Sequence, residues 1–302
     1  MTTIGTAVHL TDADVGSDEW HEARRTRING SEIAAVLGLS PYESAFSLWH
    51  RKVGALGSVE TSDVMYWGTT LEPVIRAEWN KRHPDMAVVE TGQWQHRDRP
   101  WQGGSPDGLG QERLWEAKTA HLYLADQWGE PGTDEIPIQY RCQTLWYLDV
   151  FGFEFCDVSV LIGGSDYREY VVRRRDTELA VMRAKAIEFL ATLQAEQVPA
   201  IDGHEATYEA VKELHPDIEP TAVELDPAIA VPYLDALAEH AAATEAKRRT
   251  SALVVDAMGS AKDAYYAGRR IASRQAKKTE GSTPYLVAAK GAVDHHQKGI
   301  AA

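Results

Sequence analysis

Helix-like and strand-like patterns follow one another along the first two-thirds of the chain, and this order constrains the fold more than any other feature. A helix should begin near Trp67 and end before Pro84, because apolar residues recur there at helical spacing. Short β-like runs follow at 86–90 and 113–118, separated by glycine-rich turns. The chain is therefore expected to combine helices with strands in this region.

Further elements are expected on both sides of this region. Ser17, Ser31 and Ser44 can each cap a short helix, and Gly38 can close the second of these helices. Farther along, two alternating runs joined by glycine-rich residues 163–166 predict a hairpin. The longer elements are expected as a helix at 138–150, hairpin strands at 155–162 and 167–172, and a helix at 176–198.

The acidic, proline-containing stretch 215–221 predicts a linker between two domains. We expect a first domain at 1–215 and an extension at 222–302, in which an alanine-rich helical region is followed by basic residues. Residues 245–278, called the basic segment below, contain nine Lys or Arg residues against three acids, although the whole chain has a net charge of −14. The extension is therefore predicted to be mainly helical and basic.

The composition argues against several classes of protein. A net charge of −14 does not suit a protein that coats nucleic acid, because nonspecific affinity comes from neutralising phosphates. The two cysteines, Cys142 and Cys156, are too few for a four-cysteine iron–sulfur cluster and are expected to be reduced, buried thiols. No membrane-spanning stretch and no leader-like N-terminus are seen, so we expect a cytoplasmic protein without a membrane partner.

One pattern combines an acid on a turn with an acid and a base on a strand. Asp107 lies in a Pro-Asp-Gly turn, and Glu116 and Lys118 follow on a strand whose alternation directs both side chains to the same face. Magnesium prefers carboxylate oxygens, so Asp107 and Glu116 are candidate metal ligands. Lys118 is then placed to orient or activate an attacking water.

The same residues also allow a purely structural interpretation. Glu116 and Lys118 can form an ion pair, and Asp107 can simply shape its turn. A Glu-x-Lys triplet is common, and Glu245 and Lys247 form a second one in the alanine-rich helical stretch, where a solvated helix face explains it. A buried-looking strand is a costly place for two charges, however, and on these residues alone the two interpretations are equally supported.

Five ordered motifs decide between them, because the chain resembles the YqaJ-type viral recombinase family, which is similar to the phage lambda exonuclease. The resemblance covers most of the first two-thirds of the chain. The motifs are Asn29-Gly30-Ser31-Glu32-Ile33 with its continuation to Pro41-Tyr42, Trp67-Gly68-Thr69-Thr70-Leu71-Glu72-Pro73, Ser105-Pro106-Asp107-Gly108, Glu116-Ala117-Lys118, and Tyr140-Arg141-Cys142-Gln143.

This resemblance implies an α/β fold with a PD-(D/E)XK nuclease core, a mixed central sheet flanked by helices. It implies catalytic roles for Glu72, Tyr140 and Gln143 beside Asp107, Glu116 and Lys118. Metal ligands are implied at Asp107, Glu116, Glu72 and Ala117, with Mg²⁺ as the cofactor and Mn²⁺ able to substitute. Binding of the terminal phosphate of DNA is implied for Arg24, Ser31 and Ser105, although Arg25 and Arg27 lie close to Arg24 and Ser31 is equally plausible as a helix cap.

The expected function is metal-dependent resection of one strand of linear double-stranded DNA, in the 5′-to-3′ direction, for phage-type recombination. Expected partners are the DNA, a single-strand annealing protein and further copies of the chain in a trimeric ring. Two alternatives remain: an endonuclease on the same fold, and a catalytically silent module that binds DNA ends. The basic segment is predicted to contact the DNA backbone, or alternatively to dock on an acidic protein surface.

Overall fold

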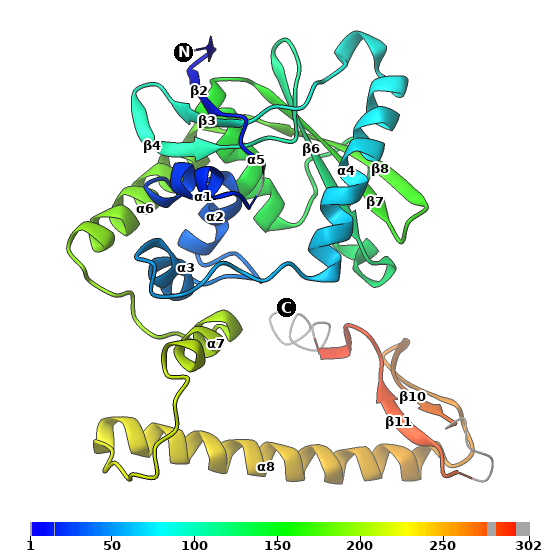
Figure 1. Ribbon diagram of the computed structural model, residues 1–302. Coiled ribbons are helices and arrows are strands. Elements are labelled where there is room, and N and C mark those ends of the chain that lie inside the picture. Colours follow the sequence, from blue (N-terminus) through cyan, green and yellow to red (C-terminus); the bar gives the residue numbers. More distant parts are fainter. Residues whose placement is uncertain (1, 15, 277–281, 294–302) are drawn as a thin grey trace. The chain divides into compact units, whose positions relative to one another are not determined.

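The computed structural model describes residues 2–14, 16–276 and 282–293. The chain forms two compact units, Met1–Ile218 and Glu219–Ala302, which run from blue to yellow-green and from yellow to red in Figure 1. Lys277 and Lys278 of the basic segment lie outside the described residues. All the predicted site residues belong to the first unit.

A mixed four-stranded sheet lies at the centre of the first unit. Its strand order is β5-β6-β7-β8, with β6 and β7 parallel and the outer pairs antiparallel. A parallel pair needs a crossover connection, and the helix α5 supplies it. The strands are β5 (Gly108–Leu109), β6 (Arg113–Ala120), β7 (Phe155–Ile162) and β8 (Asp166–Arg173). The predicted mixed sheet and the predicted hairpin of β7 and β8 are both confirmed.

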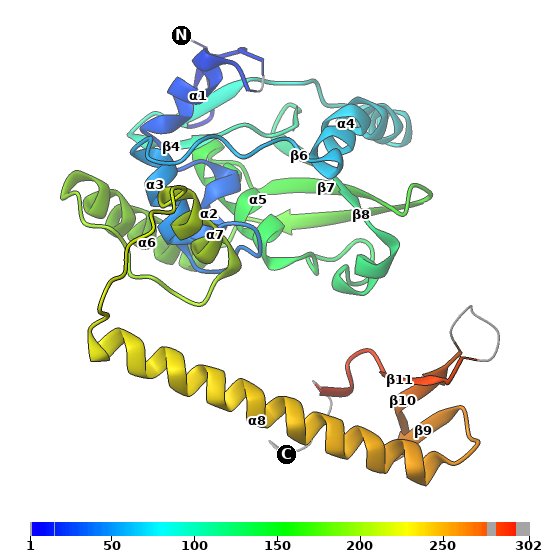
Figure 2. The same ribbon diagram turned by 60° about the horizontal axis from the view of Figure 1, so that its bottom comes forward.

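Helices cover both faces of this sheet (Figures 1 and 2). On one face, Ile75 and Trp79 of α4 (Asp63–Arg82) pack with Trp115 of β6. On the other face, the apolar side of α5 (Ile138–Phe151) packs with Val158 and its neighbours on β7. The alternation of side chains along β6 therefore assigns Trp115 to the α4 side and leaves Glu116 on the α5 side.

A second, antiparallel sheet has the order β1-β2-β3-β4. Its strands are β1 (Thr3–Ile4), β2 (Ala7–Thr11), β3 (Gln93–His96) and β4 (Arg99–Gly104). None of these four strands was predicted: β1 pairs with β2, β2 pairs with β3 far away in sequence, and β3 and β4 lie where glycine-rich turns were expected. The β-like run predicted at 86–90 is wrong: it holds only an isolated bridge between Val89 and Leu109, after the 3₁₀ turn η1 (Pro84–Met86).

Among the remaining helices of this unit, one cap differs from the prediction, α6 ends at Gln194 rather than at residue 198, and α7 and η2 were not predicted. Ser17 and Ser44 cap α1 and α3 as predicted, but the N-cap of α2 is Asn29 rather than Ser31. The side chain of Glu32 accepts the Asn29 N–H at 2.9 Å, which fixes this start and leaves Ser31 inside the first turn. The helices are α1 (Asp18–Arg25), α2 (Gly30–Val36), α3 (Ala45–Lys52), α6 (Asp176–Gln194) and α7 (Glu205–Leu214), with a 3₁₀ helix η2 (Leu122–Gln127).

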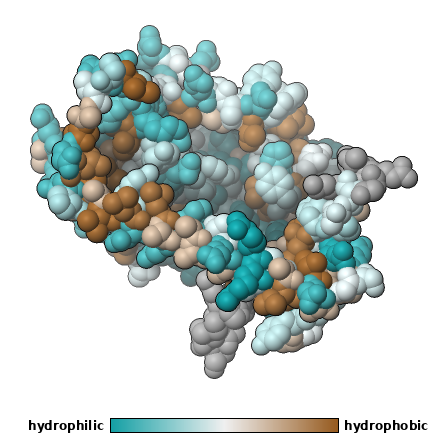
Figure 3. Space-filling view, turned by 90° about the horizontal axis from the view of Figure 1, so that it is seen from below, coloured by the Kyte–Doolittle hydropathy of each residue, from teal (hydrophilic) through white to brown (hydrophobic). Residues whose placement is uncertain are grey.

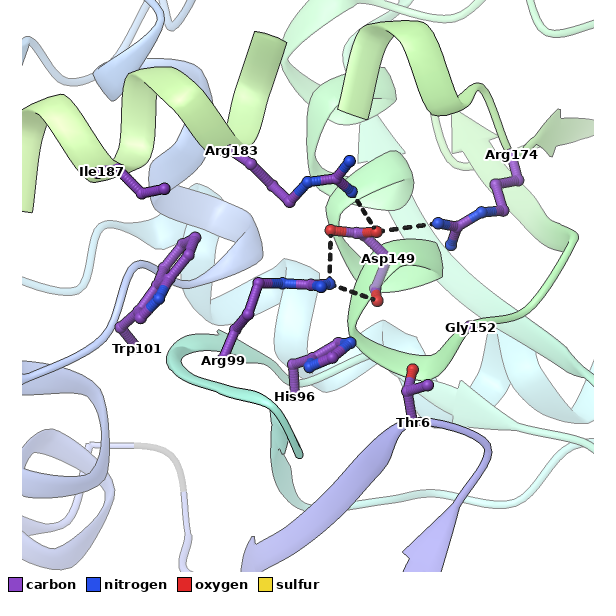
Figure 4. Close-up of a pocket in the computed structure, with 9 residues that line it drawn as sticks. All are labelled: Thr6, His96, Arg99, Trp101, Asp149, Gly152, Arg174, Arg183 and Ile187. Atoms are coloured by element: carbon purple, nitrogen blue, oxygen red, sulfur yellow. Dashed lines mark hydrogen bonds and ion pairs between the residues drawn. The ribbon is translucent and has the colours of Figure 1, made fainter. Parts of the chain in front are cut away.

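The helix α5 is the best-anchored element of the first unit. Gly30 of α2 allows a very close approach, because a Cβ atom added there would lie 2.2 Å from the Tyr147 ring. Two residues after Tyr147, the buried carboxylate of Asp149 accepts hydrogen bonds from Arg99, Arg174 and Arg183, as Figure 4 shows. These contacts tie α5 to α2, β4 and α6, and so hold the site-facing side of α5 in place.

The second unit contains the helix α8 (Pro227–Met258) and a three-stranded antiparallel sheet of order β11-β10-β9. The sheet was not predicted from the sequence; its strands are β9 (Asp263–Tyr266), β10 (Arg269–Gln275) and β11 (Tyr285–Ala288). Among the described residues of this unit only Ala272 is buried. Brown hydrophobic patches lie between teal areas on the face seen in Figure 3, and exposed apolar residues of α8 include Ile229, Leu234 and Leu237.

Two smaller predictions are also answered. Cys142 and Cys156 are both free and buried, as expected. Within the described part of the chain, no helix combines the length and apolar character needed to span a membrane.

Candidate active site

Glu116 and Lys118 lie side by side on β6, as the alternation predicts. Their register partners on β7 are Val158 and Val160. Glu116 is only 1% exposed, and the Lys118 ammonium donates a hydrogen bond to its Oε1 atom. The predicted ion pair is therefore present, but it accounts for only one of the two oxygens of Glu116.

The turn that precedes β6 holds Asp107 against the strand. The backbone N–H of Ala117 donates to Asp107 Oδ2 at 2.9 Å, while Gly108 pairs with Trp115 in the short ladder of β5 and β6. Burial raises the pKa of Asp107 above its usual range. The turn thus places a second, half-buried carboxylate next to Glu116.

The second oxygen of Glu116 has no hydrogen-bond partner among the residues that the structure describes. Its Oε1 atom accepts from Lys118 and, at 2.6 Å, from Gln143 Nε2, whereas its buried Oε2 atom makes no hydrogen bond. Burial, followed by the negative charge of Asp107, raises the pKa of Glu116 to about 8. A buried polar atom without a partner is costly, so this arrangement suits a carboxylate that binds something further.

Lys118 keeps its charge in this environment. Burial alone would lower the pKa of its ammonium, but the carboxylates of Glu116 and Asp107 raise it above the usual range. Its Nζ atom also lies 5.1 Å from the centre of the Tyr140 ring, a cation–π distance. Lys118 is therefore a fixed cation between the two carboxylates and an aromatic side chain.

Glu72 approaches the same group of charges from α4. Burial and the charge of Asp107 raise the pKa of Glu72 to about 7. Arg76, one turn later, lies 3.4 Å from Glu72 and donates to the backbone oxygen of Asp107 at 2.9 Å and to Glu90 at 2.7 Å. Arg76 was missed at the sequence level, although its i, i+4 spacing from Glu72 is a signal that could have found it.

Tyr140, Gln143 and Tyr147 of α5 form a row of side chains along the site. Gln143 Nε2 donates both to Glu116 and, at 2.9 Å, to the Tyr147 hydroxyl. Tyr140, one turn earlier, lies near Lys118 and 3.4 Å from the Tyr42 hydroxyl. Gln143 therefore links the buried carboxylate to the tyrosine that follows it on the helix.

The predicted phosphate-binding residues and two of the acids line one cleft of about 730 Å³. Arg24 lies over the Trp20 ring at 4.3 Å and donates to Ser31 Oγ at 2.8 Å. The neighbouring arginines differ, because Arg25 pairs with Glu22 and Arg27 binds Gln95, and neither lines the cleft. The predicted residues on the cleft wall are Arg24, Ser31, Ser105, Glu72 and Asp107.

The donor set fits a hard divalent cation in part. Within the described residues, no three His, Cys, Asp or Glu side chains are grouped as a ready-made metal site. Mg²⁺, however, commonly uses only one or two carboxylates and keeps several waters. The free oxygen of Glu116 and the raised pKa of Asp107 beside it suit such a cation. Ala117 was predicted to be a metal ligand. Its backbone N–H donates to Asp107, and this contact does not test that role.

The sequence of this chain was compared with known protein families. Residues 19–154 match the model of the YqaJ-like viral recombinase domain. This region of the chain is similar to that domain family. It contains every predicted site residue and has the PD-(D/E)XK arrangement predicted from the sequence, with an acid on a turn followed by an acid and a lysine on one strand of a mixed sheet.

The chain has relatives in bacteria and viruses. The chain is 28% identical over 225 residues to the uncharacterized protein YqaJ of Bacillus subtilis, covering 72% of this chain and 70% of that protein. A shorter match of 58 residues is 40% identical to protein D345L of African swine fever virus, covering 19% of this chain and 17% of D345L.

Among solved structures, an alkaline exonuclease (LHK-Exo) from Laribacter hongkongensis is 25% identical, with a TM-score of 0.48, and the match covers 60% of this chain and 94% of that one. A phage related exonuclease from Haemophilus somnus is 9% identical, with a TM-score of 0.44, over 58% of this chain and 98% of that one.

Proposed function

We propose that this protein is a metal-dependent exonuclease that hydrolyses one strand of linear double-stranded DNA. The observation that carries the proposal is the shared cleft, in which a serine–arginine pair suited to phosphate meets the carboxylates Glu72 and Asp107. A module that only binds DNA ends has no use for buried acids that repel phosphate. The similarity to the YqaJ-like viral recombinase domain supports the same class of activity.

Each side chain has a distinct part in the proposed reaction. Asp107 and Glu116 would hold Mg²⁺, which supplies charge stabilisation for the phosphodiester and an activated water. Lys118 orients the attacking water and balances the negative charge, because Glu116 and Asp107 keep it protonated. Gln143 fixes the orientation of Glu116 through its hydrogen bond at 2.6 Å. Glu72 is placed to contact the metal directly or through water.

The direction of digestion is proposed to be 5′-to-3′, with a preference for a 5′-phosphorylated end. Arg24 and Ser31 are hydrogen bonded to each other and line the cleft with Ser105. Ser31 also lies in the first turn of α2, where backbone N–H groups favour an anion. Equal rates on phosphorylated and hydroxyl ends, over a range of salt concentration, would remove these three residues from the site.

Two kinds of partner are proposed on the basis of the family. Further copies of the chain would form a trimeric ring, and enclosure of the duplex would keep an acidic protein on DNA without strong electrostatic affinity. A single-strand annealing protein would receive the exposed strand. Light scattering that shows a monomer at micromolar concentration, together with distributive digestion, would contradict the ring.

The basic segment is proposed to contact the DNA backbone. In its described part, Tyr265 and Tyr266 are exposed and pair with Arg270 and Arg269 across the β9–β10 ladder, a combination of stacking and charge that suits nucleic acid. Each lost phosphate contact should lower the slope of log affinity against log salt by about 0.9. If deletion from Thr244 onward changes only the melting temperature, the segment is structural.

The decisive test of the proposed function uses linear duplexes labelled at either end and a covalently closed circle of the same sequence. We expect digestion of the linear DNA alone, only with Mg²⁺ or Mn²⁺, and with loss of the 5′ label first. Cleavage of the closed circle would indicate an endonuclease. Binding of ends without cleavage in either metal would indicate a silent module.

A further inference from the structure

A second pocket, of about 380 Å³, lies at the end of β6, where Thr119 and Ala120 are among its lining residues. It is lined mainly by aromatic and apolar side chains, and we call it the aromatic pocket. Its aromatic walls are Tyr42, Trp67, Trp128 and Tyr140. Trp128 and Tyr140 stack at 5.8 Å, whereas Tyr42 and Trp67 are 65% and 56% exposed. Two of the four rings therefore lack a packing partner over much of their surface.

The aromatic pocket is continuous with the catalytic residues through three elements. On β6, Thr119 and Ala120, which line the pocket, directly follow Lys118. On α4, Trp67 and Leu71 line the pocket, while Thr69 and Glu72 line the cleft. The same helix thus borders both spaces.

The helix α5 borders both the aromatic pocket and the cleft, and its residues give the distance between them. Tyr140 lines the aromatic pocket, Gln143 contacts Glu116, and Tyr147 lines the cleft. Seven helical residues span about 10 Å, which is close to the rise of three stacked nucleotides at about 3.4 Å each. Glu116 therefore lies between the two spaces, at a separation that a short piece of one DNA strand can bridge.

The chemistry of the aromatic pocket suits a base and not a phosphate. Its wall contains no Lys or Arg side chain and includes the carboxylate of Asp63. The wall also has neutral hydrogen-bond donors and acceptors, which can bind the edge of a base, on Thr119, Gln127 and Gln139. Stacking on exposed aromatic rings is the usual way in which proteins hold bases of a single strand.

We propose that the aromatic pocket holds a nucleobase of the strand being cut, on the side of the scissile phosphodiester away from the terminal phosphate. The proposal rests on the proposed nuclease function, and it adds a subsite that positions the strand by stacking. Tyr42 and Trp67 are positioning residues in this subsite. Loss of either ring weakens the hold on the base without removing a group that takes part in hydrolysis.

The test uses Tyr42→Ala and Trp67→Ala, with Tyr208→Ala as the control. Tyr208, on α7, is as exposed as Tyr42, at 65%, but does not line either space. The first readout is binding in EDTA of end-phosphorylated duplexes that carry 2-aminopurine at successive positions, followed by the fluorescence of that base. The second readout is single-turnover cleavage in Mg²⁺ of duplexes with one abasic residue at those positions.

For the unchanged protein, one position near the 5′ end should show quenched 2-aminopurine fluorescence, and an abasic residue there should slow cleavage about tenfold. Tyr42→Ala and Trp67→Ala should bind intact DNA about tenfold more weakly and lose the sensitivity to that abasic residue. Tyr208→Ala should behave like the unchanged protein. Equal cleavage of all abasic substrates, or full sensitivity retained in both pocket variants, would overturn the subsite.

The two proposals fail in different ways. If no substrate is cleaved but fluorescence in EDTA still depends on Tyr42 and Trp67, the nuclease function fails and the base subsite stands. If linear DNA is cleaved normally without any dependence on the base or on the two rings, the subsite fails alone. An aromatic pocket that serves a protein partner would give this second result.

Discussion

Two buried carboxylates of the first unit, Glu116 and Asp149, have opposite electrostatic environments. Both residues are no more than 2% exposed. Asp149 accepts from Arg174 and Arg183 on one oxygen and from Arg99 and Gln102 on the other. Glu116 accepts from Lys118 and Gln143 on one oxygen and has a free second oxygen.

The pKa values follow this difference. Burial alone would raise the pKa of Asp149, but hydrogen bonds from Gln102 and Arg183 bring it below its usual range. Burial and Asp107 instead raise the pKa of Glu116 to about 8. A fully satisfied buried carboxylate fastens elements together, whereas an incompletely satisfied one beside other acids is typical of a functional site. The predictions below use this contrast, with Asp149 as the structural reference.

Replacement of Glu116 should have the largest effect. Glu116→Gln should lower the rate of DNA hydrolysis about 1,000-fold or more, equivalent to about 4 kcal/mol, because it removes a proposed metal ligand. Single-turnover digestion of a linear duplex measures the change. Glu245→Gln, in the second Glu-Ala-Lys triplet, is the matched control and should leave the rate unchanged. Full activity of Glu116→Gln in Mg²⁺ would remove this residue from the site.

Replacement of Asp149 should instead act on stability. Asp149→Asn leaves Arg99, Arg174 and Arg183 without their counter-charge, which should lower the free energy of unfolding by about 3 kcal/mol. Urea denaturation gives the value. Asp176→Asn, at the 77% exposed partner of Arg174, should change it by less than about 0.5 kcal/mol. An equally small change for Asp149→Asn would contradict the fastening role.

The two carboxylates should also give opposite dependences of stability on pH in EDTA. The raised pKa of Glu116 means that the folded protein binds this proton more tightly than the unfolded chain, so stability should fall as the pH rises from the ordinary carboxyl range to about 8 and should level off above that. The lowered pKa of Asp149 means that stability should fall as acid protonates it. Glu116→Gln should flatten the slope between the ordinary carboxyl range and about pH 8, although Glu72 contributes to it as well, and Asp149→Asn should flatten the slope in acid. Unfolding curves that keep the same slope below about pH 8 in Glu116→Gln would be evidence against the raised pKa.

The smallest effect is expected at Gln143, which orients Glu116 without binding the metal. Gln143→Ala removes one hydrogen bond to the carboxylate and should lower kcat about tenfold, or about 1.4 kcal/mol. Steady-state kinetics separate kcat from KM. A fall as large as that of Glu116→Gln would mean that Gln143 contacts the reacting groups itself.

The sequence predicts the catalytic strand well because the signal there is local. Alternation places Glu116 and Lys118 on one face of β6, and the structure confirms this arrangement. Local spacing does not indicate that Asp107 and Glu72 lie at the same site as Glu116. The order of the motifs does, through the resemblance to the family. The meeting of Asp107 and Glu72 in one cleft with Arg24 depends on pairing between distant segments.

Asp149 and the strand β2 were missed because they depend on such distant contacts. Asp149 appears in the sequence as a polar residue in an apolar helix, and nothing local indicates its three arginine partners from β4, α6 and the loop before α6. The strand β2 is stabilised by β3, more than 80 residues away. The N-cap of α2 shifts from Ser31 to Asn29 because Glu32 bonds the Asn29 N–H, which is a local signal that a capping-box search would have found.

The central claim is that Glu116, unlike Asp149, is incompletely satisfied because it binds a divalent cation. Calorimetric titration of Mn²⁺ into the unchanged protein, Glu116→Gln and Asp149→Asn tests this claim directly, without DNA. Binding should be present in the unchanged protein and in folded Asp149→Asn, and at least about tenfold weaker in Glu116→Gln. Equal Mn²⁺ affinity in all three proteins would contradict the assignment of Glu116 to a metal site.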